Sequence, residues 1–214
     1  IVVVNKVDRP GLDSLAVVSE IEAKLGIEPV PMNWPIGSGL DFRGLVDLAG
    51  DRAHLFDRTA GDLRVPYRTI GLDQLANLDV RADVARGVLE EVELLRSAGA
   101  SFSQYRFLSG AATPVFFGSA LKNYGIEHFL QAFLALCPSP GPRRSNRGLI
   151  EPSHGEFTGF VFKIQANLDP RHRDRVAFVR VCSGRFERDM EVLHERTGNR
   201  VRLGRAHLVF GRDR

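Results

Sequence analysis

The feature that most constrains the fold of this chain is an aliphatic run followed directly by a polar tetrapeptide. Ile1-Val2-Val3-Val4 is continuously β-branched, and Asn5-Lys6-Val7-Asp8 comes straight after it. Runs of this kind are typical of strands in a parallel sheet that is covered on both faces. Such a strand needs neighbouring strands and covering helices, and nothing upstream in the sequence supplies them. We therefore expect an internal fragment of a longer protein.

Strand and helix patterns alternate over the first two thirds of the chain. After the first strand, Asp13 or Ser14 is predicted to cap a helix that ends at Gly26. This alternation predicts an α/β domain with a largely parallel sheet. The further predicted elements are a helix over about 79–96, a strand over 114–118 and a helix over 126–136.

The last third of the chain has a different pattern. Three prolines within residues 138–142 favour an extended connector, which we place at 138–155. Residues 156–214 then show short alternating strands separated by turn signals such as Ser183-Gly184, a pattern typical of a β-barrel or sandwich. Only four or five strands fit in this length, so the barrel is expected to be partial.

Charge divides the chain in the same way. Residues 1–142 carry 13 basic and 17 acidic side chains, whereas residues 143–214 carry 16 basic and 9 acidic ones. A basic second half on a mildly acidic first half indicates two domains, the second of which faces polyanions such as nucleic acid. A genome that prefers arginine codons would explain why arginine outnumbers lysine, but not why the surplus lies in one half.

The tetrapeptide Asn5-Lys6-Val7-Asp8 lies where ligands bind in open α/β sheets, beyond the carboxyl end of a strand. An ionised Asp8 can accept two adjacent hydrogen bonds, which matches the N1–H and N2–H₂ donors of guanine and disfavours adenine. Asn5 can bond the N7/O6 edge and brace the loop, and the stem of Lys6 can lie over the ring face. The alternative is a polar loop that matches by chance.

A second segment, Gly118-Ser119-Ala120-Leu121, follows the strand at 114–117 and is expected at the same edge of the sheet. Small residues bring backbone N–H groups close to a ligand, and guanine O6 is the natural acceptor. Taken alone, such a segment is usually a turn; paired with the first one it completes a guanine pocket. The predicted nucleotide-binding residues are Asn5, Lys6, Asp8, Ser119, Ala120 and Leu121.

With these two segments the chain resembles the translational GTPases, whose base-recognition motifs have the form Asn-Lys-x-Asp and Ser-Ala-Leu. About 110 residues separate the two segments, and members like elongation factor G carry an inserted subdomain there. The resemblance places the insert at about 27–110, where Trp34 to Gly39 and Phe42 to Leu48 look like family stretches. It implies the C-terminal part of a P-loop GTPase domain over 1–137, followed by a truncated β-barrel, the second domain of translation factors.

A narrower resemblance is carried by residues 157–178. Phe157 to Asn167, Asp169-Pro170 and His172 to Phe178 are similar to the release-factor branch of the bacterial translational GTPases, as is Trp34 before Pro-Ile-Gly. The resemblance implies a protein that uses GTP binding and hydrolysis on the ribosome to eject the stop-codon-reading release factors.

Apolar runs far shorter than the roughly 20 residues of a membrane helix, and only two cysteines, Cys137 and Cys182, indicate a cytoplasmic protein without membrane association. We expect it to be a monomer at full length.

The motifs that handle phosphates are absent from the sequence. There is no G-x-x-x-x-G-K-[ST] loop and no D-x-x-G motif ahead of Asn5. By the resemblance, the phosphate cradle and the ligands of the Mg²⁺ that accompanies GTP or GDP lie upstream. We therefore expect a GTPase as the full-length protein, no catalytic residue and no metal site within this sequence, and an inactive fragment.

The loop with Arg171, Arg173 and Arg175 is interpreted as a contact for ribosomal RNA, because clustered guanidinium groups bind phosphates. The alternative is a solvated loop with internal Arg–Asp pairs.

Two other functions remain open at this stage. One is an elongation-factor-G-like or ribosome-protection GTPase, which the sequence downstream would distinguish. The other is a non-hydrolysing RNA- or ribosome-binding module, which an upstream sequence without a phosphate loop would support.

Overall fold

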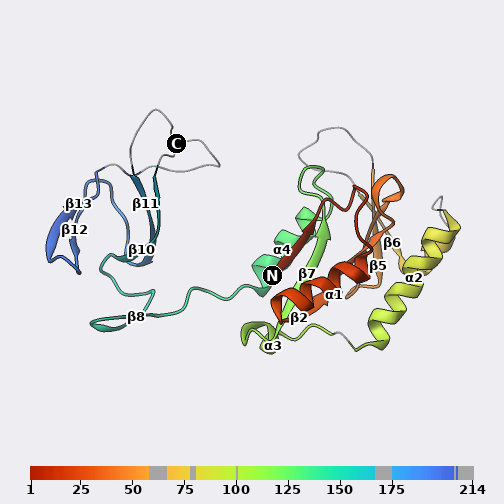
Figure 1. The fold of residues 1–214 in the computed structure, drawn as a ribbon, viewed down its shortest axis with the longest axis horizontal. Helices are drawn as coiled ribbons and strands as arrows, with labels where there is room; N and C mark the ends of the chain where they lie inside the picture. Colours follow the sequence, from red (N-terminus) through yellow and green to blue (C-terminus); the bar gives the residue numbers. More distant parts are fainter. Residues whose placement is uncertain (58–66, 78–80, 100, 167–174, 205, 207–214) are drawn as a thin grey trace. The chain divides into compact units, whose positions relative to one another are not determined.

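A computed structural model describes residues 1–57, 67–77, 81–99, 101–166, 175–204 and 206. The chain divides into two compact units, Ile1–Pro138 and Ser139–Arg214. The first unit contains the alternating strands and helices, and the second contains only strands and turns among its described residues (Figure 1).

A three-stranded parallel sheet organises the first unit. Its strand order is β1 (Val2–Asn5), β7 (Ala112–Gly118), β2 (Glu28–Pro31), so β7 is central. Every residue of β7 is buried. β1 was expected to be fully buried, but it is half-buried: Val2 and Val4 pack on the core, while Val3 is 38% exposed. The reason is that, among the described residues, β1 pairs with β7 alone.

The helix after β1 has the predicted ends. In α1 (Ser14–Leu25) the Asp13 carboxylate accepts hydrogen bonds from the backbone N–H groups of Leu15 and Ala16, and Gly26 closes the helix with φ of 63°. These are the standard N-cap and left-handed C-cap arrangements. The apolar side of α1 packs on the core beside the parallel sheet.

The other helices follow the predicted pattern with shifted bounds. They are α2 (Ala82–Ser97), α3 (Gln104–Leu108) and α4 (Ile126–Leu136). The helix predicted over 79–96 thus begins at Ala82 in the described residues, and residues 78–80 lie outside them. The prediction of a helix over 126–136 is confirmed.

A second, antiparallel sheet follows β2 directly. Its order is β3 (Asn33–Ile36), β4 (Gly44–Asp47), β5 (Arg52–Phe56), β6 (Tyr67–Gly71), with short 3₁₀ turns η1 (Gly39–Asp41) and η2 (Leu72–Asn77). β2 lies inside the range 27–110 expected for the insert, yet it pairs with β7 and so extends the parallel sheet. Only Met32 separates the two sheets along the chain.

The core of the first unit lies where β3 meets β7 and α2. Trp34 of β3 is fully buried, stacks edge-on against Phe117 of β7 at 5.1 Å between ring centroids, and donates its Nε1–H to Glu91 Oε2 at 2.6 Å. Val88 and Val92 of α2 belong to the same buried cluster. One aromatic side chain therefore joins the two sheets and the helix.

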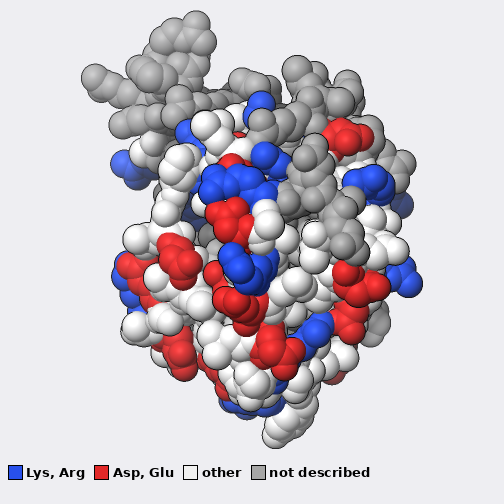
Figure 2. Space-filling view, turned by 90° about the vertical axis from the view of Figure 1, so that its right-hand side faces the viewer, with Lys and Arg blue, Asp and Glu red and all other residues white. Residues whose placement is uncertain are grey.

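The outer side of α2 carries charges of both signs. Figure 2 shows basic and acidic side chains interspersed on this face. Arg81 pairs with Asp83 at 2.7 Å and with Asp41 at 3.3 Å, and Arg96 pairs with Asp51. Exposed pairs of this kind contribute little to stability and keep the surface solvated.

The described residues of the second unit form three two-stranded antiparallel sheets. The pairs are β8 (Arg143–Ser145) with β9 (Gly148–Ile150), β10 (Thr158–Ala166) with β11 (Arg175–Ser183), and β12 (Glu191–His194) with β13 (Asn199–Arg202). The first pair lies in the segment expected to be an extended connector. Its hairpin forms because Ser145 Oγ donates to the carbonyl of Gly148 and accepts from the N–H of Arg147. Within the described residues the pairs do not close into a barrel.

No helix in the described part of the chain is long and apolar enough to span a membrane.

Candidate functional site

The two segments singled out in the sequence lie side by side. β1 and β7 are parallel neighbours, and Asn5 at the end of β1 is in register with Gly118 at the end of β7. The backbone N–H of Val7 donates to the carbonyl of Gly118 at 3.2 Å. Both loops therefore leave the sheet at one point of its carboxyl edge, where open α/β sheets bind ligands.

Asn5 holds the two loops together. Its Oδ1 accepts from the N–H of Lys6 at 2.9 Å and from the N–H of Ala120 at 3.0 Å. Lys6 has a φ of 72°, in the left-handed region, and the Lys6 carbonyl accepts from the N–H of Arg9 to close the turn. Asn5 thus has the bracing role that the sequence predicted.

Two side chains at this edge keep unpaired polar atoms. Among the described residues, three buried side-chain polar atoms have no hydrogen-bond partner, and two of them are Asp8 Oδ1 and Ser119 Oγ; the third is His128 Nδ1. Buried polar groups in proteins are nearly always satisfied, so an unsatisfied one requires an explanation. A carboxylate acceptor and a hydroxyl flanking one sheet edge fit a ligand that offers hydrogen-bond donors and an acceptor.

The loop after β7 is closed on itself and exposes its tip. Ser119 and Tyr124 exchange two backbone hydrogen bonds of 3.0 Å. Ala120 is exposed and Leu121 is 77% exposed. The loop then turns through Gly125, whose φ is 73° and where a Cβ would lie 2.4 Å from Leu45 Cδ1. Any side chain at position 125 would therefore force the Leu45 side chain or the loop to shift, and would be strained at this positive φ.

The segment after β3 supports the first loop, a contact that the sequence analysis missed. The N–H of Gly39 in η1 donates to the carbonyl of Val7 at 3.3 Å. Gly39 has a φ of 56°, and a Cβ there would lie 3.1 Å from the backbone nitrogen of Pro10. The signal available in the sequence was the pair Gly37 and Gly39. Such a pair indicates a tight turn, but it does not indicate which segment the turn contacts.

Asn33 supports the second loop and was also missed. It is fully buried, its Oδ1 accepts from the Phe117 N–H at 2.7 Å, and its Nδ2 donates to the Phe117 carbonyl at 3.0 Å. The amide thereby continues the pairing of β7 beyond the end of β2. The only signal for this role in the sequence was Asn33 itself, one polar residue beside the apolar residues Trp34, Pro35 and Ile36.

Replacing Asn33 by Leu should lower the free energy of unfolding by about 2–4 kcal/mol, because two buried backbone groups of Phe117 lose their partners. Urea unfolding followed by circular dichroism measures this. Gln104→Leu, at an exposed position of α3, is the control and should change stability by no more than about 0.5 kcal/mol. Equal stability of Asn33→Leu and the parent would contradict the structural role of this amide.

The described structure thus gathers all six predicted nucleotide-binding residues at one edge: Asn5, Lys6, Asp8, Ser119, Ala120 and Leu121. Of the three arginines interpreted as an RNA contact, Arg175 is exposed at the start of β11 in the second unit. Arg171 and Arg173 lie outside the described residues, so the RNA contact stays a prediction.

Two family models match the chain. Residues 1–139 match the elongation factor Tu GTP binding domain, and residues 156–214 match elongation factor G domain 2. These matches confirm the expected fold class: part of a GTPase domain followed by part of the translation-factor barrel.

Curated relatives indicate which branch of the translation factors the chain is similar to. Proteins named peptide chain release factor 3 from Gloeobacter violaceus and from a Synechocystis strain are each 48% identical to the chain over 99% of its length, 213 and 214 residues respectively. The chain spans 40% and 39% of the length of these relatives. The expected resemblance to the release-factor branch is confirmed.

A crystal structure of a protein from Thermus thermophilus has the same fold. The two structures superpose with a TM-score of 0.57, and their sequences are 22% identical. The match covers 95% of this chain and 30% of the Thermus thermophilus chain.

Proposed function

Since the chain belongs to the translational GTPase family that carries the elongation factor Tu GTP binding domain, we propose that the edge formed by β1 and β7 reads the guanine base of GTP and GDP. The observation that carries this proposal is the pair of buried, unpaired atoms, Asp8 Oδ1 and Ser119 Oγ, beside loops that Asn5 ties together. The site residues are Asn5, Lys6, Asp8, Ser119, Ala120 and Leu121.

Guanine fits the donors and acceptors of this edge. The Asp8 carboxylate accepts from N1–H and N2–H₂, and the backbone N–H groups of the 118–121 loop are the donors suited to O6. The aliphatic stem of Lys6 covers one face of the ring. Adenine lacks the 2-amino donor and the O6 acceptor, so each of these contacts would be lost or repulsive.

The phosphate and Mg²⁺ ligands of the full-length protein are proposed to lie outside the 214 residues. Asp8 and the 118–121 loop suit a base and not a phosphate, because a carboxylate repels phosphate oxygens. This sequence therefore supplies base recognition, and GTP hydrolysis needs residues that it does not contain.

For the whole protein we propose GTP-dependent release of the stop-codon-reading release factors from the ribosome. The 48% identity to proteins named peptide chain release factor 3 supports this function over an elongation-factor-G-like or ribosome-protection role. Arg171, Arg173 and Arg175 are proposed to contact ribosomal RNA phosphates, in line with the basic second half of the sequence.

The test uses full-length protein and ribosomes that carry a release factor at a stop codon. We expect loss of the labelled release factor from the ribosome with GTP, and none with ATP. Turnover of GTP should require the same ribosomes. If GTP is hydrolysed but the release factor stays bound, the protein is a translational GTPase with another role; if GTP does not bind, the guanine site itself is wrong.

A further inference from the structure

The buried residue Gly39 in η1 contacts the chain on both sides of Asp8. Its N–H donates to the carbonyl of Val7 at 3.3 Å, and a Cβ at Gly39 would lie 3.1 Å from the backbone nitrogen of Pro10. Val7 directly precedes Asp8, and Pro10 follows it by two positions. The backbone that carries the Asp8 carboxylate therefore lies between two contacts with one glycine.

Val7 is fixed through three of its groups. Its carbonyl accepts from Gly39, its N–H donates to the carbonyl of Gly118 at 3.2 Å, and its side chain packs on the core of the first unit. These contacts leave the peptide group between Val7 and Asp8 little freedom to rotate. Asp8 Oδ1 has no hydrogen-bond partner among the described residues, so the backbone sets where this oxygen lies.

The turn η1 is itself held in place. Arg43 Nη1 donates to the carbonyls of Leu40 at 2.9 Å and Phe42 at 3.2 Å, which fixes the shape of the turn. Asp41 pairs at 3.3 Å with Arg81, the residue at the N-cap of α2. The position of η1 is therefore tied to the antiparallel sheet and to the start of α2.

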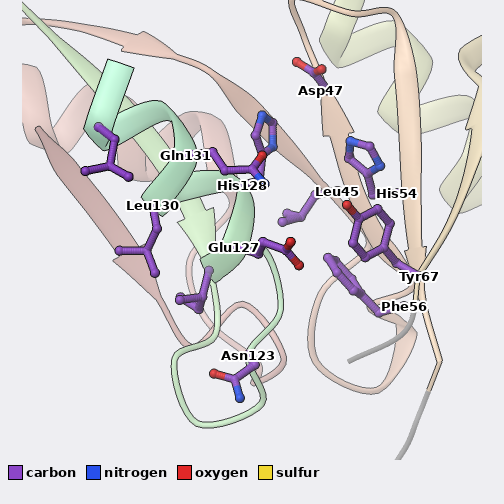
Figure 3. Close-up of a pocket in the computed structure, with 13 residues that line it drawn as sticks. Leu45, Asp47, His54, Phe56, Tyr67, Asn123, Glu127, His128, Leu130 and Gln131 are labelled. Carbon is purple, nitrogen blue, oxygen red and sulfur yellow. The ribbon is translucent and has the colours of Figure 1, made fainter. Parts of the chain in front are cut away.

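The same antiparallel sheet supports the second loop of the proposed base edge. Leu45 of β4 leaves no room for a Cβ at Gly125, and Asn33 of β3 bonds the backbone of Phe117. Leu45 also lines a cavity of about 670 Å³ between this sheet and α4, which Figure 3 shows. Both loops thus rest on β3, β4 and the turn between them.

We propose that Gly39 is a positioning residue for guanine recognition: through Val7 and Pro10 it sets where the Asp8 carboxylate meets the base. This inference rests on the proposed function, because Gly39 acts only through Asp8. Hydrogen bonds weaken steeply when their geometry departs from the preferred distance and angle. Discrimination of the 2-amino group therefore depends on η1, a turn outside the two loops that contact the base.

Gly39→Ala should displace Asp8. A φ of 56° is strained for alanine, and the added Cβ would lie 3.1 Å from both the nitrogen and the Cγ of Pro10, which is tighter than ordinary contact. Pro10 cannot yield as a flexible side chain does, because its ring is closed on the backbone. Relief of the contact must move Pro10 and η1 apart, and the Asp8 carboxylate moves with them.

The measurement is the ratio of the affinities for GDP and inosine diphosphate, titrated calorimetrically into the full-length protein. The base of inosine diphosphate lacks only the 2-amino group, so the ratio reports the hydrogen bond from N2–H₂ to Asp8. The parent should bind GDP roughly 10–100-fold more tightly, the range for one hydrogen bond to a charged group. In Gly39→Ala the ratio should fall at least about fivefold, because a displaced carboxylate loses most of this bond.

The ratio separates positioning from a loss of stability. A partly unfolded sample binds both nucleotides less, by the same factor, and keeps the parent's ratio. Gly26→Ala is the matched control for backbone strain, since Gly26 has a φ of 63° and no heavy atom of the described residues lies within 4 Å of an added Cβ. This control should keep the parent's ratio.

A second variant tests the same turn without a steric clash. Arg43→Met removes the donor to the carbonyls of Leu40 and Phe42, so the ratio should fall at least about threefold as the turn loosens. Arg144→Met makes the same change at an exposed position of β8 and should leave the ratio unchanged. Circular dichroism melting verifies the fold of each variant, and Arg43→Met decides if Gly39→Ala does not fold.

The outcomes distinguish this inference from the proposed function. A parent that binds GDP and inosine diphosphate equally well would overturn the proposed base site, and the role of Gly39 with it. A parent that discriminates, together with a folded Gly39→Ala or Arg43→Met that discriminates equally well, would overturn the positioning role and leave the base site standing.

Discussion

Asp8→Asn should convert the full-length protein from a GTP binder into a binder of xanthosine triphosphate. The amide faces guanine N2–H₂ with a donor or offers a single acceptor, whereas it can donate to the 2-oxo group of xanthine. Sites built on paired polar contacts reject mismatched ligands by up to about 10⁴-fold, so we expect GTP affinity to fall at least about 100-fold. Titration of both nucleotides into parent and variant measures the change.

The control for this substitution is Asp13→Asn. It removes the same charge five residues away, and asparagine caps a helix as well as aspartate does. This variant should keep the parent's affinity for GTP and gain none for the xanthine nucleotide. If Asp8→Asn behaves in the same way, the Asn5 to Asp8 segment is only a loop and the proposed base site is wrong.

Trp34→Ala should lower the free energy of unfolding of the first unit by about 3–5 kcal/mol, the range for truncating a buried tryptophan. The side chain is fully buried against Phe117, and its loss also leaves Glu91 without the indole N–H. Urea unfolding must be followed by circular dichroism, because Trp34 is the only tryptophan in the sequence.

Trp34→Phe separates packing from the hydrogen bond to Glu91. It keeps most of the buried apolar surface and should cost about 1.5–3 kcal/mol, the range for a hydrogen bond to a charged group. A loss below about 1 kcal/mol for Trp34→Ala would contradict the place of this residue at the junction of the two sheets.

Local patterns in the sequence were sufficient for several elements. The β-branched run predicted β1, the apolar spacing after Asp13 predicted α1 with its cap and its end at Gly26, and the run before Gly118 predicted β7. Each of these depends on neighbours within a few residues along the chain. The two segments proposed to read the base were found in the same way, since each directly follows such a strand.

The positions of strands in their sheets were less predictable. β2 lies within a range assigned to an insert, and only its parallel register with β7 shows that it belongs to the main sheet. A four-residue strand that contains two prolines carries little signal of its own. In the second unit, the alternation in β10 and β11 was recognised, but which further strands pair with them depends on contacts between distant residues.

By itself the sequence determined the two loops of the proposed nucleotide edge, the strands β1 and β7 that precede them and the helix α1, because these are set by short-range periodicity, capping and turn chemistry. The tertiary structure alone decided that Asn33 bonds Phe117, 84 positions away, and that Asp47 and His54 face His128 across a cavity. Such contacts form when separate elements pack, and packing selects partners by shape and by the pairing of buried polar groups, which no local spacing encodes.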